Sequence, residues 1–183
     1  SRNGERKHIV KELSDADLER FPVEQVTWED CQQFVERLNK LEKETGWVYR
    51  LPTSTEWEYA CRGGPMSDKA DSTFDFYFAK PTNTLLPELA NANIGLKRAC
   101  QVGSYEPNPL GFYDMHGNVI EWCEDSAKAA GTYWRVVRGG GMDSDSDHCR
   151  AAYHHATPPL TRYGNLGLRL ARVPAGEPAL DKK

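Results

Sequence analysis

Apolar residues recur at helical spacing early in the chain. They fall on one face of a 3.6-residue repeat, at Cys31, Phe34, Val35, Leu38 and Leu41. Thr27 followed by Asp30 provides a helix N-cap with an acidic residue in the first turn. Gly46 stands where a helix should end. The pattern predicts an amphipathic helix between these limits, with its apolar face in the core.

A second, shorter helix is predicted after a strand at Val48–Leu51. Thr53 and Glu56 have the spacing of a capping box, in which each side chain accepts a hydrogen bond from the backbone of the other. The apolar face then consists of Trp57, Ala60 and Cys61, and the Gly63–Gly64 pair ends the helix.

The remainder of the chain contains little periodic pattern. We expect strands at 135–138 and 166–172, an irregular polar segment at 143–161, and a long loop region at 65–99 with a short strand around 74–78. Few helices, short strands and much loop predict a compact α+β domain. We place the domain at 21–173, between a polar N-terminal segment at 1–20 and a frayed tail at 174–183.

Composition excludes several classes of protein. The 183 residues suit one domain, and 39% hydrophobic with 27% charged residues is ordinary for a globular chain. A net charge of -4 gives no basic footprint for nucleic acid, and no apolar run approaches the roughly 20 residues of a membrane span. No signal peptide is visible, and the compartment, cytoplasm or cell surface, stays open. The five cysteines include no C-x-x-C pair, so we expect buried or free thiols.

Several long motifs occur in a fixed order. They are the segments Phe21–Asp30, Arg50–Gly63, Asn93–Ile94, Val102–Asn108, Gly111–Asp125, Arg138–Gly141 and Asn165–Ala171. In this order they resemble the formylglycine-generating enzyme (sulfatase-modifying factor) family. The resemblance implies a C-type lectin-like fold, with two helices packed on a small antiparallel sheet and loops that carry the binding surface. Family members usually open with a further strand. That strand is not seen here, so we expect another chain or segment to cover the sheet edge.

The resemblance also identifies a lost site. Family oxidases hold copper(I) with two cysteines placed after the Gly-Gly pair and oxidise a substrate cysteine to formylglycine. The corresponding positions here hold Ser144 and Cys149. Copper(I) is soft and prefers a pair of thiolates, which a serine hydroxyl cannot replace. We therefore expect no catalytic residues and no copper, and we interpret Cys149 as a scaffold residue.

The resemblance implies a family calcium site in the Asp114–Glu121 loop. By position its ligands are the side chains of Asp114 and Glu121 and the backbone carbonyls of Gly117 and Val119. Hard oxygen donors in a tight loop suit Ca²⁺. The same loop held only by hydrogen bonds, sodium or water is the alternative. A second family site would use Asn93 and Ile94, and we expect it to be lost because the acidic loop that completes it is shortened to Gly95–Gln101.

The segment after the Gly-Gly pair is rich in residues that suit molecular recognition. The candidate ligand-binding residues are Asp143, Ser144, Asp145, Ser146, Asp147, His148, Tyr153, His154, His155, Tyr163 and Gly164. Tyrosine and histidine supply contact area with few rotatable bonds, while serine and aspartate supply adaptable hydrogen bonds. The same composition occurs at the variable positions of diversity-generating-retroelement proteins, which share this scaffold.

We therefore expect a non-enzymatic domain that binds a protein ligand through this surface. A variable protein and a fixed-ligand interaction domain of a larger signalling protein both remain open. A copper-dependent cysteine oxidase that uses Cys149 with a ligand from elsewhere is the enzymatic alternative. Metal binding by the three histidines, calcium binding by 143–148 and sugar binding by the Glu106–Asn108 tripeptide are weaker interpretations, because each motif is incomplete.

Overall fold

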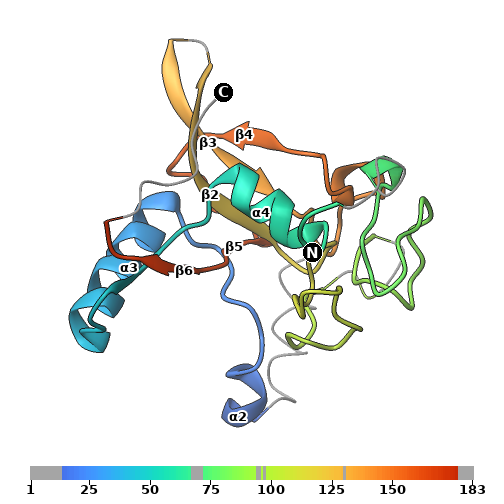
Figure 1. Cartoon of the computed structure of the whole chain (residues 1–183), viewed down its shortest axis with the longest axis horizontal. Coiled ribbons are helices and arrows are strands. Elements are labelled where there is room, and N and C mark those ends of the chain that lie inside the picture. Colours follow the sequence, from blue (N-terminus) through green and yellow to red (C-terminus); the bar gives the residue numbers. More distant parts are fainter. Residues whose placement is uncertain (1–13, 67–71, 94–95, 97, 130, 177–183) are drawn as a thin grey trace, which may run out of the picture.

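The computed structural model describes residues 14–66, 72–93, 96, 98–129 and 131–176. The helices are α2 (Asp15–Leu18), α3 (Trp28–Glu42), α4 (Ser54–Cys61) and the 3₁₀ turn η2 (Asp147–Cys149). The strands are β1 (Trp47–Arg50), β2 (Ile120–Ala129), β3 (Thr132–Arg138), β4 (His155–Thr157), β5 (Leu166–Leu168) and β6 (Ala171–Pro174). Figure 1 shows the strands, α3 and α4 at the left and centre of the molecule, and the long loops, with η2 among them, at the right.

The strands form two separate sheets. The larger has the order β4-β3-β2-β5, and the smaller pairs β1 with β6. β2 and β3 form an antiparallel hairpin whose end projects from the molecule (Figure 1). β5 pairs with β2 in parallel, with Ile120 opposite Leu166. The expected single antiparallel sheet is therefore wrong: the sheets are small, but there are two of them, and one pairing is parallel.

Helix α3 begins as the sequence predicts. The Thr27 hydroxyl accepts a hydrogen bond from the backbone N–H of Asp30 at 3.0 Å, and the Asp30 carboxylate accepts one from the Thr27 N–H at 2.8 Å. The predicted end at Gly46 is wrong, because the helix ends at Glu42 and Lys43 adopts the left-handed conformation with φ 46°. Gly46 lies in the following turn with φ 83°.

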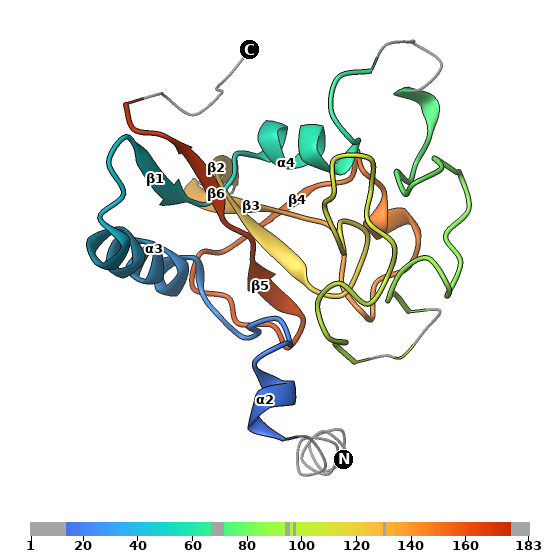
Figure 2. The same ribbon diagram turned by 60° about the horizontal axis from the view of Figure 1, so that its bottom comes forward.

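Helix α4 follows the predicted capping box at Thr53 and buries Trp57 and Cys61. It packs on β2 and β3, whereas α3 packs on β1 of the smaller sheet (Figure 2). Helix α3 also packs on the larger sheet, because its Cys31 shares a core cluster with Trp122 and Val137, and the Trp28 indole donates to the Cys123 carbonyl oxygen at 3.1 Å.

The closing segment of the chain divides between the two sheets. The predicted strand at 166–172 is two strands, β5 on the larger sheet and β6 on the smaller one, with Arg169 and Leu170 between them. The segment around Val23 lies against the outer side of β5, because a Cβ added to Gly167 would overlap the Val23 carbonyl oxygen. In the loop region the expected strand is a single antiparallel bridge between Phe76 and Thr82.

All five cysteines are buried and free, as predicted. Four of them are distributed among the core clusters: Cys61 and Cys123 share a cluster with Trp57, Cys31 shares one with Trp122, and Cys149 shares one with the loop residue Phe76. No described helix has the length and apolar character that crossing a membrane requires.

A buried arginine joins α4, β3 and the loop that follows η2. Arg138 is 4% exposed, and its guanidinium donates to the Ser54 hydroxyl at 2.8 Å and to the Glu58 carboxylate at 2.9 Å. It also donates to the carbonyl oxygens of Ala151 and Tyr153 at 3.0 and 3.1 Å. The planar group thus satisfies acceptors from two segments that are far apart in sequence, and it joins both of them to β3.

We predict that Arg138→Lys lowers the free energy of unfolding by about 3 kcal/mol. A lysine ammonium group cannot reproduce the planar set of N–H donors of the guanidinium, so buried acceptors are left unpaired. Urea denaturation followed by tryptophan fluorescence measures the change. Arg162→Lys, at an exposed pair with Asp30, is the matched control and should leave stability nearly unchanged. Equal stability of the two variants would contradict the role assigned to Arg138.

Candidate functional site

The two positions that the resemblance assigns to a thiol pair are occupied very differently here. Cys149 is 0% exposed, and burial raises the pKa of its thiol to about 12. Ser144 lies in the preceding turn, where its hydroxyl accepts a hydrogen bond from the Gly141 N–H at 2.9 Å. Its carbonyl oxygen accepts a second from the Asn93 N–H at 3.0 Å. Both residues thus serve the local structure of the loop.

Close packing against Gly140 explains the burial of Cys149. Gly140 has φ +69°, and a Cβ there would lie 2.5 Å from the Cys149 Sγ. Only glycine allows this approach without strain. The Gly-Gly pair therefore serves to seat the segment around Cys149 against the end of β3.

The buried side chain of His116 also holds the segment around Cys149 in place. Its Nδ1 lies 2.8 Å from the Cys149 carbonyl oxygen, and its Nε2 accepts a hydrogen bond from the Tyr77 N–H at 2.9 Å. These partners require a neutral ring protonated at Nδ1. Burial accordingly lowers the pKa of His116 to about 4. The histidine is a structural link between three loops and has no exposed surface for catalysis.

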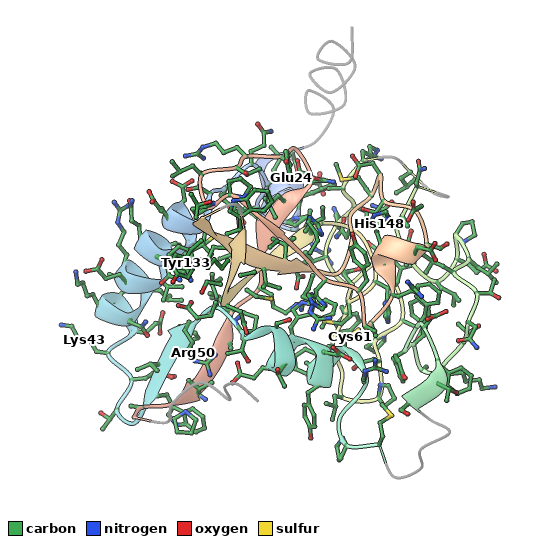
Figure 3. The ribbon with its side chains drawn as sticks, turned by 90° about the horizontal axis from the view of Figure 1, so that it is seen from above. Glu24, Lys43, Arg50, Cys61, Tyr133 and His148 are labelled. Atoms are coloured by element: carbon green, nitrogen blue, oxygen red, sulfur yellow. The ribbon has the colours of Figure 1, made fainter. Side chains whose placement is uncertain are left out.

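Four of the candidate ligand-binding residues form one aromatic and charged group. The rings of His148 and Tyr153 meet edge to face with centroids 4.7 Å apart, and Tyr153 lies 5.9 Å from His155. The Asp145 carboxylate pairs with the His148 ring, a hydrogen bond that lowers the pKa of Asp145. Burial, followed by the neighbouring histidines, lowers the pKa of His155. Figure 3 shows His148, a residue of η2, at the end of the molecule away from Lys43, the residue that follows α3.

A second group lies across the 141–144 turn from the first. Asn165 donates to the Asp143 carboxylate at 2.5 Å and packs against Gly141. Tyr163 is exposed and Gly164 is partly exposed just before it. The structure therefore brings the two ends of the candidate surface to the same turn. Of the remaining candidates, Ser146, Asp147 and His154 are exposed, and Asp147 lies 3.8 Å from Arg150.

A separate cavity of about 450 Å³ contains most of the expected calcium ligands. Asp114, Val119 and Glu121 line it, whereas Gly117 lines a much smaller neighbouring void. The Glu121 carboxylate accepts two hydrogen bonds from Arg169, at 2.7 and 2.8 Å, and one from the indole of Trp57 at 2.6 Å. Asp114 accepts one from the Gly103 N–H at 2.8 Å.

The donors at this cavity fit a cation. Two carboxylates face one guanidinium, which leaves one uncompensated negative charge, and burial raises the pKa of Asp114. Among the residues that the structure describes, no group of three or more histidine, cysteine, aspartate or glutamate side chains could hold a metal ion. A calcium ion here would therefore depend on the carbonyl oxygens of Gly117 and Val119 as well as on the two carboxylates. The second family site cannot be compared, because Ile94 and Gly95 lie outside the described residues.

Sequence reasoning missed the polar side chains that hold these loops together. Arg138, His116 and Arg169 all stand inside the quoted motifs, but their partners come from distant segments. Asn108 is a similar case: its amide donates to the carbonyl oxygens of Ala60 and Cys61 at the end of α4. It is therefore committed to the fold, which weakens the sugar-binding interpretation of the tripeptide further.

The side-chain oxygen of Asn91 is buried and has no hydrogen-bond partner in the described part of the chain. Its nitrogen donates to the Arg98 carbonyl oxygen at 2.7 Å. Asn118 links this region to the candidate calcium loop, because its side-chain oxygen accepts the Cys100 N–H at 3.0 Å. No periodic pattern predicts such contacts.

Comparison with known proteins places this geometry in context. The model of the sulfatase-modifying factor enzyme 1-like domain matches residues 3–174. The kinase Pkn1 of Chlamydia pneumoniae is 31% identical over 176 residues, covering 84% of this chain and 24% of the kinase. The inactive Cα-formylglycine-generating enzyme 2 of Bos taurus is 32% identical over 169 residues, covering 86% of this chain and 52% of that protein.

Among solved structures, variable protein 1 of Treponema denticola superposes with a TM-score of 0.69 at 25% identity. The match covers 82% of this chain and 70% of that one. This chain spans about a quarter of the kinase and about half of the bovine protein.

We predict that Cys149 resists alkylation in the folded protein. With a pKa of about 12, roughly one thiol in ten thousand is ionised at pH 8, and the sulfur is also shielded from solvent. Intact-mass spectrometry after iodoacetamide treatment at pH 8 should show no adduct at Cys149 in the native protein and five adducts in denaturant. Rapid native labelling of Cys149 would contradict its assignment as a scaffold residue.

Proposed function

The chain belongs to the family of sulfatase-modifying factor enzyme 1-like domains, and we propose that it is a non-enzymatic member that binds a protein ligand. In this proposal the lectin-like scaffold presents the loops at 141–164 as its binding surface. The surface comprises the two groups described above, one around Tyr153 and one around Asn165.

The proposal rests on Ser144 and Cys149, which stand at the positions of the thiol pair in family oxidases. Oxidation of a thiol substrate on copper(I) requires two accessible soft donors. Cys149 lies under Gly140 with a protonated thiol, and the Ser144 hydroxyl is engaged with the backbone of its own turn. The relatives include a protein named as inactive, which supports a scaffold used without oxidation.

The exposed loop chemistry supports recognition of a macromolecule. Tyr153, His148 and His155 are held in contact with one another, so little side-chain entropy is lost when a partner covers them. The likeness to a treponemal variable protein supports a surface whose residues vary between copies. The matching region makes up about a quarter of a chlamydial kinase. This likeness supports a fixed interaction domain within a longer protein. Either form uses the same surface.

We also propose Ca²⁺ as a structural ion at the cavity lined by Asp114 and Glu121. The carboxylates of these two residues and the carbonyl oxygens of Gly117 and Val119 would hold it. The ion would supply the positive charge that the site lacks and would fix the loop that precedes β2. Arg169 and Trp57 orient the Glu121 carboxylate toward the same region. The proposal includes no copper and no catalytic residue.

A variant with alanine at Tyr153, His155 and Tyr163 should keep its fold and lose at least tenfold in affinity for its protein partner, because aromatic anchors dominate such surfaces. Biolayer interferometry against the captured partner measures the affinity, and circular dichroism checks the fold. The exposed Tyr133, at the tip of the β2–β3 hairpin, provides the matched Tyr133→Ala control. Unchanged binding would place the surface elsewhere. Stoichiometric copper(I) binding with turnover of a cysteine peptide would favour the oxidase alternative.

Calcium at a hundredfold excess over its dissociation constant should stabilise the folded protein by about 2.7 kcal/mol. For a domain of this size the melting temperature should then rise by roughly 5–11 °C. Differential scanning calorimetry in EDTA and in CaCl₂ measures the shift. Asp114→Asn retains an acceptor for the Gly103 N–H but removes a charge, and its shift should be smaller. A melting temperature that does not respond to calcium would refute the ion site.

A further inference from the structure

The cavity beside Asp114 is far larger than a metal ion requires. Its volume of about 450 Å³ falls in the range of small-molecule and side-chain binding sites, roughly 300–1,000 Å³. A water molecule occupies a volume of only about 30 Å³ in the liquid. The surplus volume indicates room for an organic group.

The charges inside the cavity leave a single unpaired carboxylate. Arg169 and Glu121 form a two-point ion pair at 2.7 and 2.8 Å, so they neutralise each other. Arg169 also donates to the Tyr113 carbonyl oxygen at 3.0 Å, which fixes the guanidinium against the cavity wall. Asp114 accepts only the Gly103 N–H, on Oδ2, and its other oxygen has no hydrogen-bond partner among the described residues. A cationic group is therefore complementary to the cavity.

The mouth of the cavity is apolar and aromatic. Val102, Phe112 and Tyr113 line it and are 50%, 38% and 44% exposed. Pro22 and Leu168 add further apolar wall. Aromatic rings attract cations and apolar walls accommodate aliphatic stems, so these residues, together with the Asp114 carboxylate that lines the same cavity, suit an ammonium group. A hydrated calcium ion gains nothing from these walls.

We propose that this cavity binds a primary ammonium group carried on an aliphatic stem. The head group pairs with the free oxygen of Asp114, and the stem lies between Val102, Phe112 and Tyr113. A lysine side chain of a protein and a free alkylamine share this chemistry. The site is distinct from the 141–164 surface and does not depend on it. Ammonium and calcium would neutralise the same charge, so they should compete.

The test uses the full chain and three probes: butylammonium, the capped peptide Gly-Lys-Gly and its norleucine analogue. Titration followed by the backbone amide signals of Gly103 and Asp114 should give a dissociation constant of about 1 mM for butylammonium, an affinity typical of a small ligand. The norleucine peptide, which has the stem without the charge, should bind at least tenfold more weakly. Tighter binding of the lysine peptide than of butylammonium identifies a protein side chain as the ligand; the reverse identifies a free amine.

Matched variants separate this site from its neighbours. Asp114→Asn should weaken butylammonium binding at least tenfold. Phe112→Ala and Tyr113→Ala should each weaken it about threefold, the effect of one cation–π contact at a partly exposed site. Asp147→Asn, at an exposed carboxylate on the other surface, should change nothing. The alanine variant at Tyr153, His155 and Tyr163 should still bind the amine, so failure of the proposed protein surface and failure of this site are distinguishable.

Three outcomes would overturn the proposal. The first is equal binding of the lysine and norleucine peptides, which would remove the role of charge. The second is unchanged amine binding by Asp114→Asn. The third is calcium binding that butylammonium cannot displace, which would assign the unpaired charge to the metal ion alone.

Discussion

The fold depends on the burial of the Arg138 guanidinium between α4, β3 and the loop after η2. An arginine in this position is costly to desolvate and stabilises the protein only when most of its donors are satisfied. Here Ser54, Glu58, Ala151 and Tyr153 supply the acceptors. The backbone of Tyr153 is one of them, so the same network that holds the helix on the sheet also positions the ring at the centre of the proposed binding surface.

A second ion pair lies beside this network on the same face of the larger sheet, because Glu121 stands opposite Arg138 in the β2–β3 register. Arg169 lies just after β5 and Glu121 lies on β2, so their ion pair extends the parallel pairing of these strands. Trp57 of α4 donates to the same carboxylate. The cavity beside Asp114 is therefore walled by residues that the fold already needs. Its unpaired charge is the one feature there that folding does not explain, and for that reason we connect it with a ligand.

The loops are ordered without much regular structure because polar side chains take the place of strands. His116 and Asn108 each join two or three segments through backbone acceptors and donors, and Gly140 lets Cys149 approach β3 closely. Such a framework tolerates change at exposed positions between the fixed points. It is therefore compatible with the recognition surface that we propose for the loops at 141–164.

The sequence alone determined the two capped helices, the buried free cysteines and the identity of the scaffold, because capping boxes, apolar periodicity and ordered motifs are local signals. It did not show that α3 ends at Glu42, that the closing strand divides between two sheets, or that β5 pairs in parallel with β2. These features follow from the packing of segments far apart in the chain. The same reason applies to the site: the sequence supplied candidate residues, and only the tertiary structure placed Asn165 beside Asp143 and Arg169 on Glu121.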